Sequence, residues 1–386
     1  MFLERPTINV DDIKRLIEHE VCESRSLEYK SELPKSGDEK RKFLYEISAM
    51  ANGGGGDIIY GVQEDEGRPV EANGVKSEDV DQTVLRLENL IRDCISPRIV
   101  GIVIESLKVD EERYIFVFKI PRTLNSPHMV TIGGRQRFYT RNSTGKHPMD
   151  ITEIKTAILT GANAIQNCED WYHNRLIELR LNSGPVLLQN KAKLVLHLIP
   201  FSSVISPEYL DARTLEQQQR KVLPLPGLST SSRYNSAGFL TLATPSNKEP
   251  YGYVQFFRTG QIESVDIGMF KPYLAREIPI SELEEKVINS SGQYLEALKN
   301  VGINLPIMMK LTLLGVNGYY IAPQKPFDQP RPISEDDLIL PGVLIEGWNV
   351  DTAQLLKPMF DTIWNACGKP CSPNYDEEGN RFPGGQ

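Results

Sequence analysis

The stretch Glu23-Ser24-Arg25-Ser26-Leu27-Glu28-Tyr29-Lys30 begins the part of the chain that decides the fold. Apolar and charged side chains alternate from Leu27 to Lys30, as they do in a half-buried strand. A segment with helical spacing of its apolar residues then runs to Asn52, and the glycines at 53–56 that follow it are typical of a helix end. The apolar run Asp57-Ile58-Ile59-Tyr60-Gly61-Val62 predicts a second strand. We therefore expect strand, helix and strand in close succession.

Working outward from this stretch, the length of the chain predicts two domains. Its 386 residues exceed the size at which a single hydrophobic core stops growing. Segments with helical and strand-like periodicity are mixed along the chain without an internal repeat, which is typical of α+β proteins. We expect an N-terminal α+β domain over residues 1–162 and a second α+β domain over residues 163–386.

Three local patterns make further predictions about the fold. The apolar spacing predicts two helices, over residues 150–164 and 170–181. Ser281 and Glu284 have the spacing of a capping box and predict the start of another helix. Asn317-Gly318 lies between two apolar runs and predicts a β-hairpin that pairs residues 308–315 with residues 319–322.

Composition excludes several classes of protein. No stretch approaches the ~20 apolar residues of a membrane-spanning helix, and the N-terminus lacks the apolar run of a signal peptide. The five cysteines are scattered, which favours reduced thiols over disulfides or a zinc site. The histidines lack metal-ligand spacing and no Gly-x-Ser-x-Gly sequence is present, so nucleophilic hydrolysis is not indicated. We expect a cytoplasmic protein that does not enter a membrane.

Acidic residues are concentrated in the opening stretch. Glu23 and Glu28 flank the start of the first strand, and Glu64 and Asp65 follow the second strand. Carboxylates from two strand ends are ligands that Mg²⁺ or Mn²⁺ prefers, and Lys30 would then stabilise charge on a bound phosphate. These five residues are our candidate catalytic and metal-binding site. The alternative is that the acids form an ordinary solvated surface.

A basic strand is the main indication of nucleic-acid binding. Residues 129–140 predict a hairpin with its turn at Gly133-Gly134, and no acid occurs between Glu112 and Asp150. Alternation in the returning strand places four side chains on one face; they are Arg135, Arg137, Tyr139 and Arg141. With Lys146, these side chains could contact phosphates, and the tyrosine could stack on a base. The alternative is a basic surface that pairs with the protein's own acids.

The glycines at 53–56 leave two interpretations open. Glycine-rich turns bind nucleotide phosphates, but a Walker loop requires Lys and Ser or Thr where this chain has Asp57. A negative charge at that position repels phosphate, so ATP binding is disfavoured. Helix termination and close backbone packing account for the glycines.

Together these residues resemble the Schlafen-type, AlbA-like domain family, described in bacteria as DNA-binding or ATP-binding. The resemblance covers about residues 10–160 and rests on Glu28-Tyr29-Lys30, the helix end at Ala51-Asn52, Gly55-Gly56 and Ile59-Tyr60-Gly61-Val62, with Phe138-Tyr139-x-Arg141 later. It implies a nucleic-acid-binding α+β fold. In Schlafen nucleases it also implies metal-dependent cleavage of structured RNA, such as transfer RNA, by two glutamates and one aspartate.

Carried over to this chain, Glu23 and Glu28 match the two glutamates. The aspartate is expected after Gly61-Val62, where Gln63-Glu64-Asp65 leave its register open. Eukaryotic Schlafens enclose RNA with two copies of the domain, whereas this chain has one, so a homodimer would have to supply the second. Residues 165–386 show no helix-turn-helix pattern, unlike the C-terminal regions of many bacterial members.

The leading hypothesis is therefore a divalent-metal endoribonuclease, with RNA favoured over DNA. A non-catalytic DNA- or RNA-binding regulator and an ATP-binding protein are the alternatives. In each case the second domain would bind a regulator or a protein partner.

Overall fold

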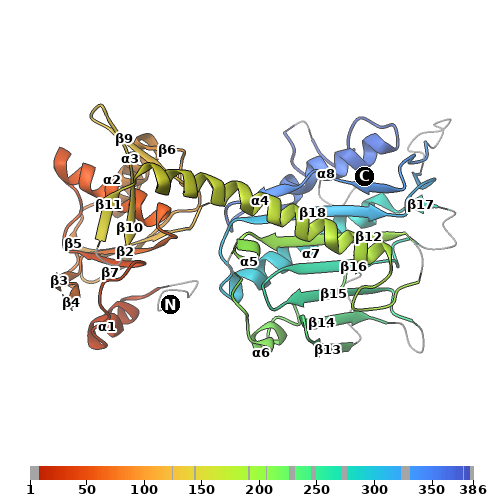
Figure 1. Cartoon of the computed structure of the whole chain (residues 1–386), viewed down its shortest axis with the longest axis horizontal. Helices are drawn as coiled ribbons and strands as arrows, with labels where there is room; N and C mark the ends of the chain where they lie inside the picture. The colour runs from red at the N-terminus through yellow and green to blue at the C-terminus, as the bar shows by residue number, and fades with distance from the viewer. Residues whose placement is uncertain are drawn as a thin grey trace. The chain divides into compact units, whose positions relative to one another are not determined.

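The computed structural model divides the chain into two compact units, Met1–Ile165 and Gln166–Gln386, which are described separately (Figure 1). It describes residues 8–123, 125–142, 145–189, 192–205, 207–225, 231–244, 249–270, 276–322, 331–376 and 378–382. The boundary that we expected, after residue 162, lies close to the boundary between the units. The α+β fold class that we predicted is confirmed in both units.

In its described residues the N-terminal unit contains two sheets, a short hairpin, three helices and the start of a fourth helix that continues into the C-terminal unit. In chain order its elements are α1 (Val10–Glu18), β1 (Leu27–Lys30), α2 (Gly37–Asn52), β2 (Gly56–Tyr60), β3 (Gln63–Asp65), β4 (Arg68–Glu71), β5 (Val75–Lys76), α3 (Val80–Cys94), β6 (Ile95–Ser96), β7 (Val103–Lys108), β8 (Arg113–Ile120), β9 (Met129–Ile132), β10 (Arg135–Asn142) and β11 (Gly145–Pro148). The predicted succession of β1, α2 and β2 is confirmed.

The first sheet has strand order β1-β2-β8-β5, with β7 also paired to β8. β1 and β2 are parallel, and β8 runs antiparallel to β2. Successive side chains of β2 enter different cores, because strand residues alternate between the two faces of a sheet. Ile58 and Tyr60 pack with α2 and α3, whereas Ile59 packs with α1. The sheet is therefore covered on both faces.

Helix α2 lies between this sheet and a second sheet of order β11-β10-β9-β6. Ser36 caps its first turn through a capping box with Glu39. One side of α2 packs Phe43 against Phe118 of the first sheet, and Tyr45 stacks on Tyr139 of β10. Helix α2 thus packs against both the sheet that contains the acidic strand β1 and the sheet that contains the basic strand β10.

The C-terminal unit is built on one large antiparallel sheet. Its elements, with the helix that enters it, are α4 (Ile151–Arg180), β12 (Lys193–Pro200), α5 (Ser202–Ile205), α6 (Ala212–Glu216), β13 (Ser231–Asn235), β14 (Gly238–Ala243), β15 (Gly252–Phe257), β16 (Ile262–Asp266), β17 (Glu277–Ile278), α7 (Ile280–Asn300), β18 (Ile307–Leu314), β19 (Tyr320–Ile321), β20 (Asp337–Ile339), β21 (Val343–Ile345) and α8 (Thr352–Ala366).

The large sheet has strand order β13-β14-β15-β16-β12-β18-β20, with β21 also paired to β18. Leu194, Leu196 and Leu198 of β12 join the main core, to which α7 and α8 contribute. The alternate residue His197 faces the opposite way, where the ring of Trp171 from α4 meets it. Figure 1 shows α4 crossing the sheet on the side away from α7.

Two local predictions were wrong, and a third was right for the helix but wrong for its cap. Residues 165–169 contain neither Gly nor Pro, so the two expected helices form the single helix α4. The helix predicted to start at Ser281 is confirmed as α7, which begins at Ile280, but the predicted capping box does not form. Glu284 is instead buried and accepts hydrogen bonds from Trp364, Ser372 and Asn374. The hairpin at Asn317-Gly318 does not form, because β20 and β21 occupy the free edge of β18 and β19 pairs with β17.

None of the helices in the described part of the chain is long and apolar enough to span a membrane.

Candidate functional site

The predicted acidic site lies on β1 and around the turn between β3 and β4. The parallel pairing of β1 with β2 sets Glu28 beside Ile58. Tyr29 points into the core that includes α1, so Glu28 and Lys30 point to the other face of the sheet. The β3–β4 turn consists of Glu66 and Gly67, both with positive φ, as a two-residue hairpin turn requires.

Glu28 is buried and held by two cations. Only 8% of the residue is exposed. Lys30 Nζ donates to Oε1 at 2.5 Å, and Arg141 Nη2 donates to Oε2 at 2.6 Å. Burial by itself raises the pKa of Glu28, but the hydrogen bonds and charges of Lys30 and Arg141 outweigh it, so the pKa is lowered. Both carboxylate oxygens are therefore engaged within the unit.

Arg141 connects the basic strand to this acidic strand from within the fold. Its residue exposure is 5%, and besides Glu28 its Nη2 donates to the carbonyl of Ser24 at 3.0 Å. A Cβ on Gly53 would lie 3.1 Å from Arg141 Cγ, so the end of α2 closely adjoins the arginine stem. Arg141 is therefore an interior residue, and its guanidinium joins β10 to β1 and to the segment before it.

Glu23 adjoins the same cluster. Its Oε1 accepts a hydrogen bond from the backbone N–H of Tyr29 at 2.9 Å, and its own N–H donates to the carbonyl of Gly67 at 2.7 Å. Burial is the largest cause of the raised pKa of Glu23, and the negative charges of Glu28 and Glu64 raise it further. Glu23 therefore lies within electrostatic range of both Glu28 and Glu64.

The two candidates for the third acid differ in position. Glu64 Oε2 accepts from the N–H of Gly67 at 2.8 Å, in the turn that also contacts Glu23. Asp65 follows Glu64 in β3, pairs in register with Arg68 and is exposed. Neighbouring strand residues project to opposite faces, so only one of the two can face Glu23. Of the two, Glu64 is the one whose charge acts on Glu23.

These residues do not fit a divalent metal in the arrangement that they adopt. The ammonium of Lys30 lies 2.5 Å from Glu28 Oε1 and 3.8 Å from Glu23 Oε1, where a bridging cation would have to sit. Among the described residues, no three His, Cys, Asp or Glu side chains are grouped so as to hold an ion. Mg²⁺ takes near-octahedral oxygen ligation, so an ion that bridged the two carboxylates would have to displace the Lys30 ammonium.

The basic strand β10 divides into an exposed end and a buried end. Arg135 and Arg137 are exposed beside the Gly133-Gly134 turn, which projects from the unit in Figure 1. Tyr139 is buried and its ring stacks on Tyr45 at 4.2 Å between centroids. The alternation that we predicted therefore continues along the strand, but only its first part faces solvent.

Lys146 lies on β11, opposite Arg141 in register. Its ammonium forms an ion pair with the buried carboxylate of Glu46 on α2. Lys146, like Arg141, therefore ties the second sheet to the first part of the unit.

Asn52 is a central residue to which we assigned no role from the sequence. Its Nδ2 donates to the carbonyl of Tyr139 at 2.8 Å, and its Oδ1 accepts from the N–H of His128 at 2.7 Å. The side chain thus holds the end of α2 to β10 and to the segment before β9. The sequence signal for this role is an asparagine at the end of a helix, directly before glycines. That signal does not identify the residues to which the asparagine bonds.

The glycines after Asn52 permit close backbone approach. Gly55 and Gly56 have φ values of +87° and +149°. A Cβ would lie 2.7 Å from the Arg122 nitrogen at Gly55 and 2.4 Å from the Ser26 oxygen at Gly56. Side chains at these positions would collide with neighbouring backbone, so packing alone accounts for both glycines.

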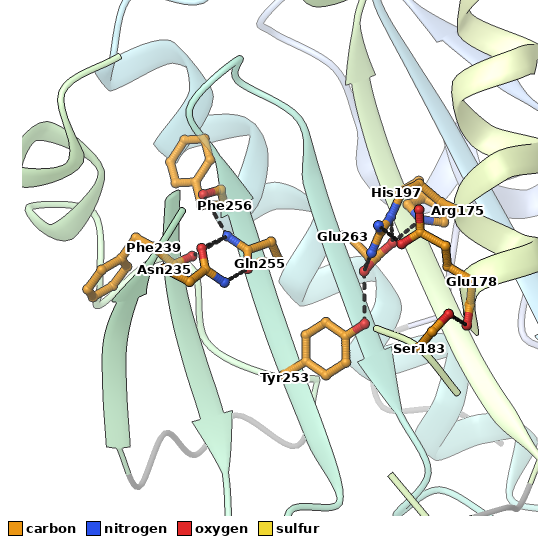
Figure 2. A network of polar contacts seen from close by, with 10 residues as sticks. All are labelled: Arg175, Glu178, Ser183, His197, Asn235, Phe239, Tyr253, Gln255, Phe256 and Glu263. Carbon is orange, nitrogen blue, oxygen red and sulfur yellow. Dashed lines mark hydrogen bonds and ion pairs between the residues drawn. The ribbon is translucent and has the colours of Figure 1, made fainter. Parts of the chain in front are cut away.

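The C-terminal unit contains a second charged cluster, shown in Figure 2. Glu263 of β16 accepts hydrogen bonds from Arg175 Nε and Nη2, both at 2.8 Å, from Tyr253 at 2.8 Å and from His197 Nε2 at 3.0 Å. Burial raises the pKa of Glu263, but the bonds and charges of Arg175 and His197 lower it to about 2. Arg175 belongs to α4 and Glu263 to the sheet, so this cluster holds the helix against the sheet. Neither Glu263 nor His197 has any exposed surface.

Comparison with known proteins identifies the N-terminal part of the chain. The family Schlafen, AlbA_2 matches residues 23–150, and no match is found among curated proteins. A crystal structure of the DIP2311 protein from Corynebacterium diphtheriae is 17% identical over 34% of this chain and 23% of that chain, with a TM-score of 0.25. The N-terminal domain of a RecG-related protein, an ATP-dependent DNA helicase relative from Nitrosomonas europaea, is 19% identical over 35% of this chain and 89% of that chain, with a TM-score of 0.28. At these TM-scores the two likenesses establish neither fold nor function.

Proposed function

Residues 23–150 are a Schlafen AlbA_2 domain, and from this premise we propose that the chain binds nucleic acid through the tip of the β9–β10 hairpin. The observation that carries the proposal is the exposure of Arg135 and Arg137, neither of which is ion-paired to an acid in the part of the chain described. Residues two apart in a strand share a face, so Arg135 and Arg137 lie on the same face of β10. Guanidinium groups match the geometry of phosphate oxygens.

Most of the remaining cations of this basic segment are used differently. Three of them pair with acids of the same unit: Lys119 with Glu105, Arg141 with Glu28, and Lys146 with Glu46. For these three, pairing with the protein's own acids is the better interpretation. Arg135 and Arg137 are exposed and form no ion pair among the described residues, a state they share with Arg113 and Arg122, but they alone stand together on one face of the hairpin, and the proposal rests on them.

The geometry favours phosphate contacts over base stacking. Tyr139 is stacked on Tyr45 and buried, so its ring is not available to a base in this arrangement. Contacts to phosphates carry little sequence information and give affinity that falls steeply with salt. We propose RNA as the first ligand, because the resemblance to Schlafen proteins implies structured RNA.

Fluorescence anisotropy with a labelled RNA hairpin, and with a DNA duplex of the same sequence, tests the proposal. Replacing both Arg135 and Arg137 by Gln is expected to weaken binding about tenfold or more, and to lower the slope of log K against log salt by about 2. The control variant changes Lys14 and Arg86 to Gln, two cations on α1 and α3. Equal affinity of the arginine variant and the wild type would refute the hairpin as the interface.

Metal-dependent cleavage is a separate question, and we propose binding without cleavage for the arrangement in which Lys30 separates Glu23 from Glu28. Incubating the chain with transfer RNA and Mg²⁺ or Mn²⁺ tests this. Cleavage that is abolished by Glu28→Gln while RNA binding persists would instead support the endoribonuclease that the resemblance implies.

A further inference from the structure

A cavity of about 280 Å³ lies at one end of the first sheet, and none of the five candidate acidic-site residues lines it. It opens beyond the carboxyl ends of the parallel strands β1 and β2, where β8 begins. The residues that line it are Ser31, Glu32, Lys35, Gly61, Gln63, Asn73, Gly74, Val75, Lys76 and Arg113. The volume corresponds to roughly nine water molecules at about 30 Å³ each, enough for a phosphate group with part of its ester.

The charge of this lining is positive although the chain is acidic. Lys35, Lys76 and Arg113 contribute three positive charges and Glu32 one negative charge, so the balance is +2, against −8 for the whole chain. The hydroxyl of Ser31 and the amides of Gln63 and Asn73 supply further hydrogen-bonding groups. Such a lining suits a small anion with several oxygens.

Arg113 is held in place by the backbone of the cavity wall. Its Nη1 lies 3.2 Å from the carbonyl of Asn73 and 3.4 Å from that of Gly74. Gly74 in turn donates its N–H to the carbonyl of Gly61 at 2.9 Å, and both glycines have positive φ. Ordering of the guanidinium before a ligand arrives reduces the entropy that binding would cost.

The two lysines are in ion pairs that a ligand can replace. Lys76 lies 2.8 Å from Glu112 and Lys35 lies 2.5 Å from Glu32, and all four side chains are more than half exposed. Exposed pairs of this kind contribute little to stability, so their rearrangement costs little. A doubly charged anion in the cavity can pair with more than one of the three cations, whereas Glu32 and Glu112 each pair with one lysine.

We propose that this cavity binds a phosphate monoester or inorganic phosphate, held by Arg113, Lys76 and Lys35. The site is distinct from the hairpin tip. Its ligand is a free small phosphate or the terminal phosphate of a nucleic acid, which share the same chemistry.

Isothermal titration calorimetry of the full chain with inorganic phosphate, at constant ionic strength, tests the site. Lys76→Gln is expected to weaken binding about tenfold, as the loss of one charge-assisted contact predicts. Arg113→Gln is expected to weaken it at least as much. Lys42→Gln, an exposed lysine of α2 outside the cavity, is the charge-matched control and is expected to bind like the wild type.

Two further titrations identify the source of the phosphate. A nucleoside monophosphate and an oligonucleotide with a 5′-phosphate are compared with the same oligonucleotide ending in a 5′-hydroxyl. Tighter binding of either phosphorylated probe supports the site, provided that Lys76→Gln removes the difference. No measurable heat with any phosphate probe, or equal losses in Lys76→Gln and Lys42→Gln, would overturn the proposal.

The outcome is separable from that of the proposed nucleic-acid interface. The variant lacking Arg135 and Arg137 is expected to keep phosphate binding, and Lys76→Gln is expected to keep affinity for an RNA hairpin with a 5′-hydroxyl end. Loss of phosphate binding in the hairpin variant would mean that the signal comes from the hairpin and would refute the cavity.

Discussion

Glu28 in the N-terminal unit and Glu263 in the C-terminal unit are both buried carboxylates that accept hydrogen bonds from an arginine distant in sequence. Arg141 is 113 residues from Glu28, and Arg175 is 88 residues from Glu263. Glu28 lies on β1, at the edge of its sheet, and its side chain keeps 11% exposure. Glu263 lies on an inner strand, has no exposure, and accepts bonds from three different residues.

This difference shows what each cluster can do. The edge position of β1 leaves the Glu28 cluster close to solvent, where a ligand or a change in the neighbouring turn could reach it. The carboxylate of Glu263 has no exposed surface and is joined to α4 through Arg175, so its role is to hold α4. Electrostatic interactions strengthen as water is excluded, and so does the cost of leaving one partner unpaired. We therefore expect changes in the inner cluster to have the larger effects on stability.

The largest effect is expected for Arg175→Met, which leaves the carboxylate of Glu263 buried without its cation. Breaking a buried pair in this way costs about 3–5 kcal/mol. All three tryptophans lie in residues 166–386, so tryptophan fluorescence in a urea titration reports the unfolding of this unit. Arg180→Met is the control on the same helix; its pair with Asp337 is partly exposed and we expect a loss of about 1 kcal/mol or less. Equal losses in the two variants would mean that burial does not distinguish the pairs.

Asp266, three residues from Glu263 on the same strand, sharpens the comparison because it lacks a paired cation. Burial raises its pKa to about 6, and its Oδ2 has no hydrogen-bond partner among the described atoms. A folded-state pKa above the unfolded value of about 3.8 means that stability is lost as pH rises from about 4 through 6. We expect Asp266→Asn to remove this loss and to raise the free energy of unfolding by about 3 kcal/mol at pH 8, with little effect at pH 4.

Fluorescence-monitored unfolding of the wild type and Asp266→Asn between pH 4 and pH 8 measures this difference. Glu282→Gln, a partly exposed acid of α7, is the control for removing a charge near Asp266. Parallel pH profiles for the wild type and Asp266→Asn would show that Asp266 does not titrate in this window.

Local periodicity predicts the elements of the N-terminal unit well because the elements themselves are local. The alternation at Leu27–Lys30, the helix that ends at Asn52 and the hairpin at 129–140 all depend on neighbouring residues. Patterns that need a free partner fail: the Asn317-Gly318 hairpin requires an edge of β18 that more distant strands occupy. Likewise, the spacing of Ser281 and Glu284 matches a capping box, yet Glu284 accepts a hydrogen bond from the distant Trp364 instead.

The same limit applies to the candidate site. The spacing correctly places Arg135, Arg137, Tyr139 and Arg141 on one face of the strand. It does not reveal that the first two are exposed whereas the last two are buried. Glu28 and Arg141 were assigned to different roles, as acid and as phosphate contact, whereas the structure pairs them. Charges far apart in sequence attract without leaving a local pattern, so only the tertiary fold reveals which of them remain exposed.

The smallest effect is expected for Glu28→Gln, which keeps the shape of the side chain and removes its charge. Arg141 then loses its charge-assisted acceptor, and we expect a loss of about 1–2 kcal/mol confined to the N-terminal unit. Because this unit contains no tryptophan, hydrogen–deuterium exchange of peptides covering β1 and β10 is the measurement, and the fluorescence transition should not move. Glu32→Gln, which breaks an exposed pair just beyond β1, is expected to leave protection unchanged. Unaltered exchange in β10 of Glu28→Gln would mean that Arg141 is held by its backbone contact and not by the carboxylate. Only the Glu263 cluster would then depend on an ion pair.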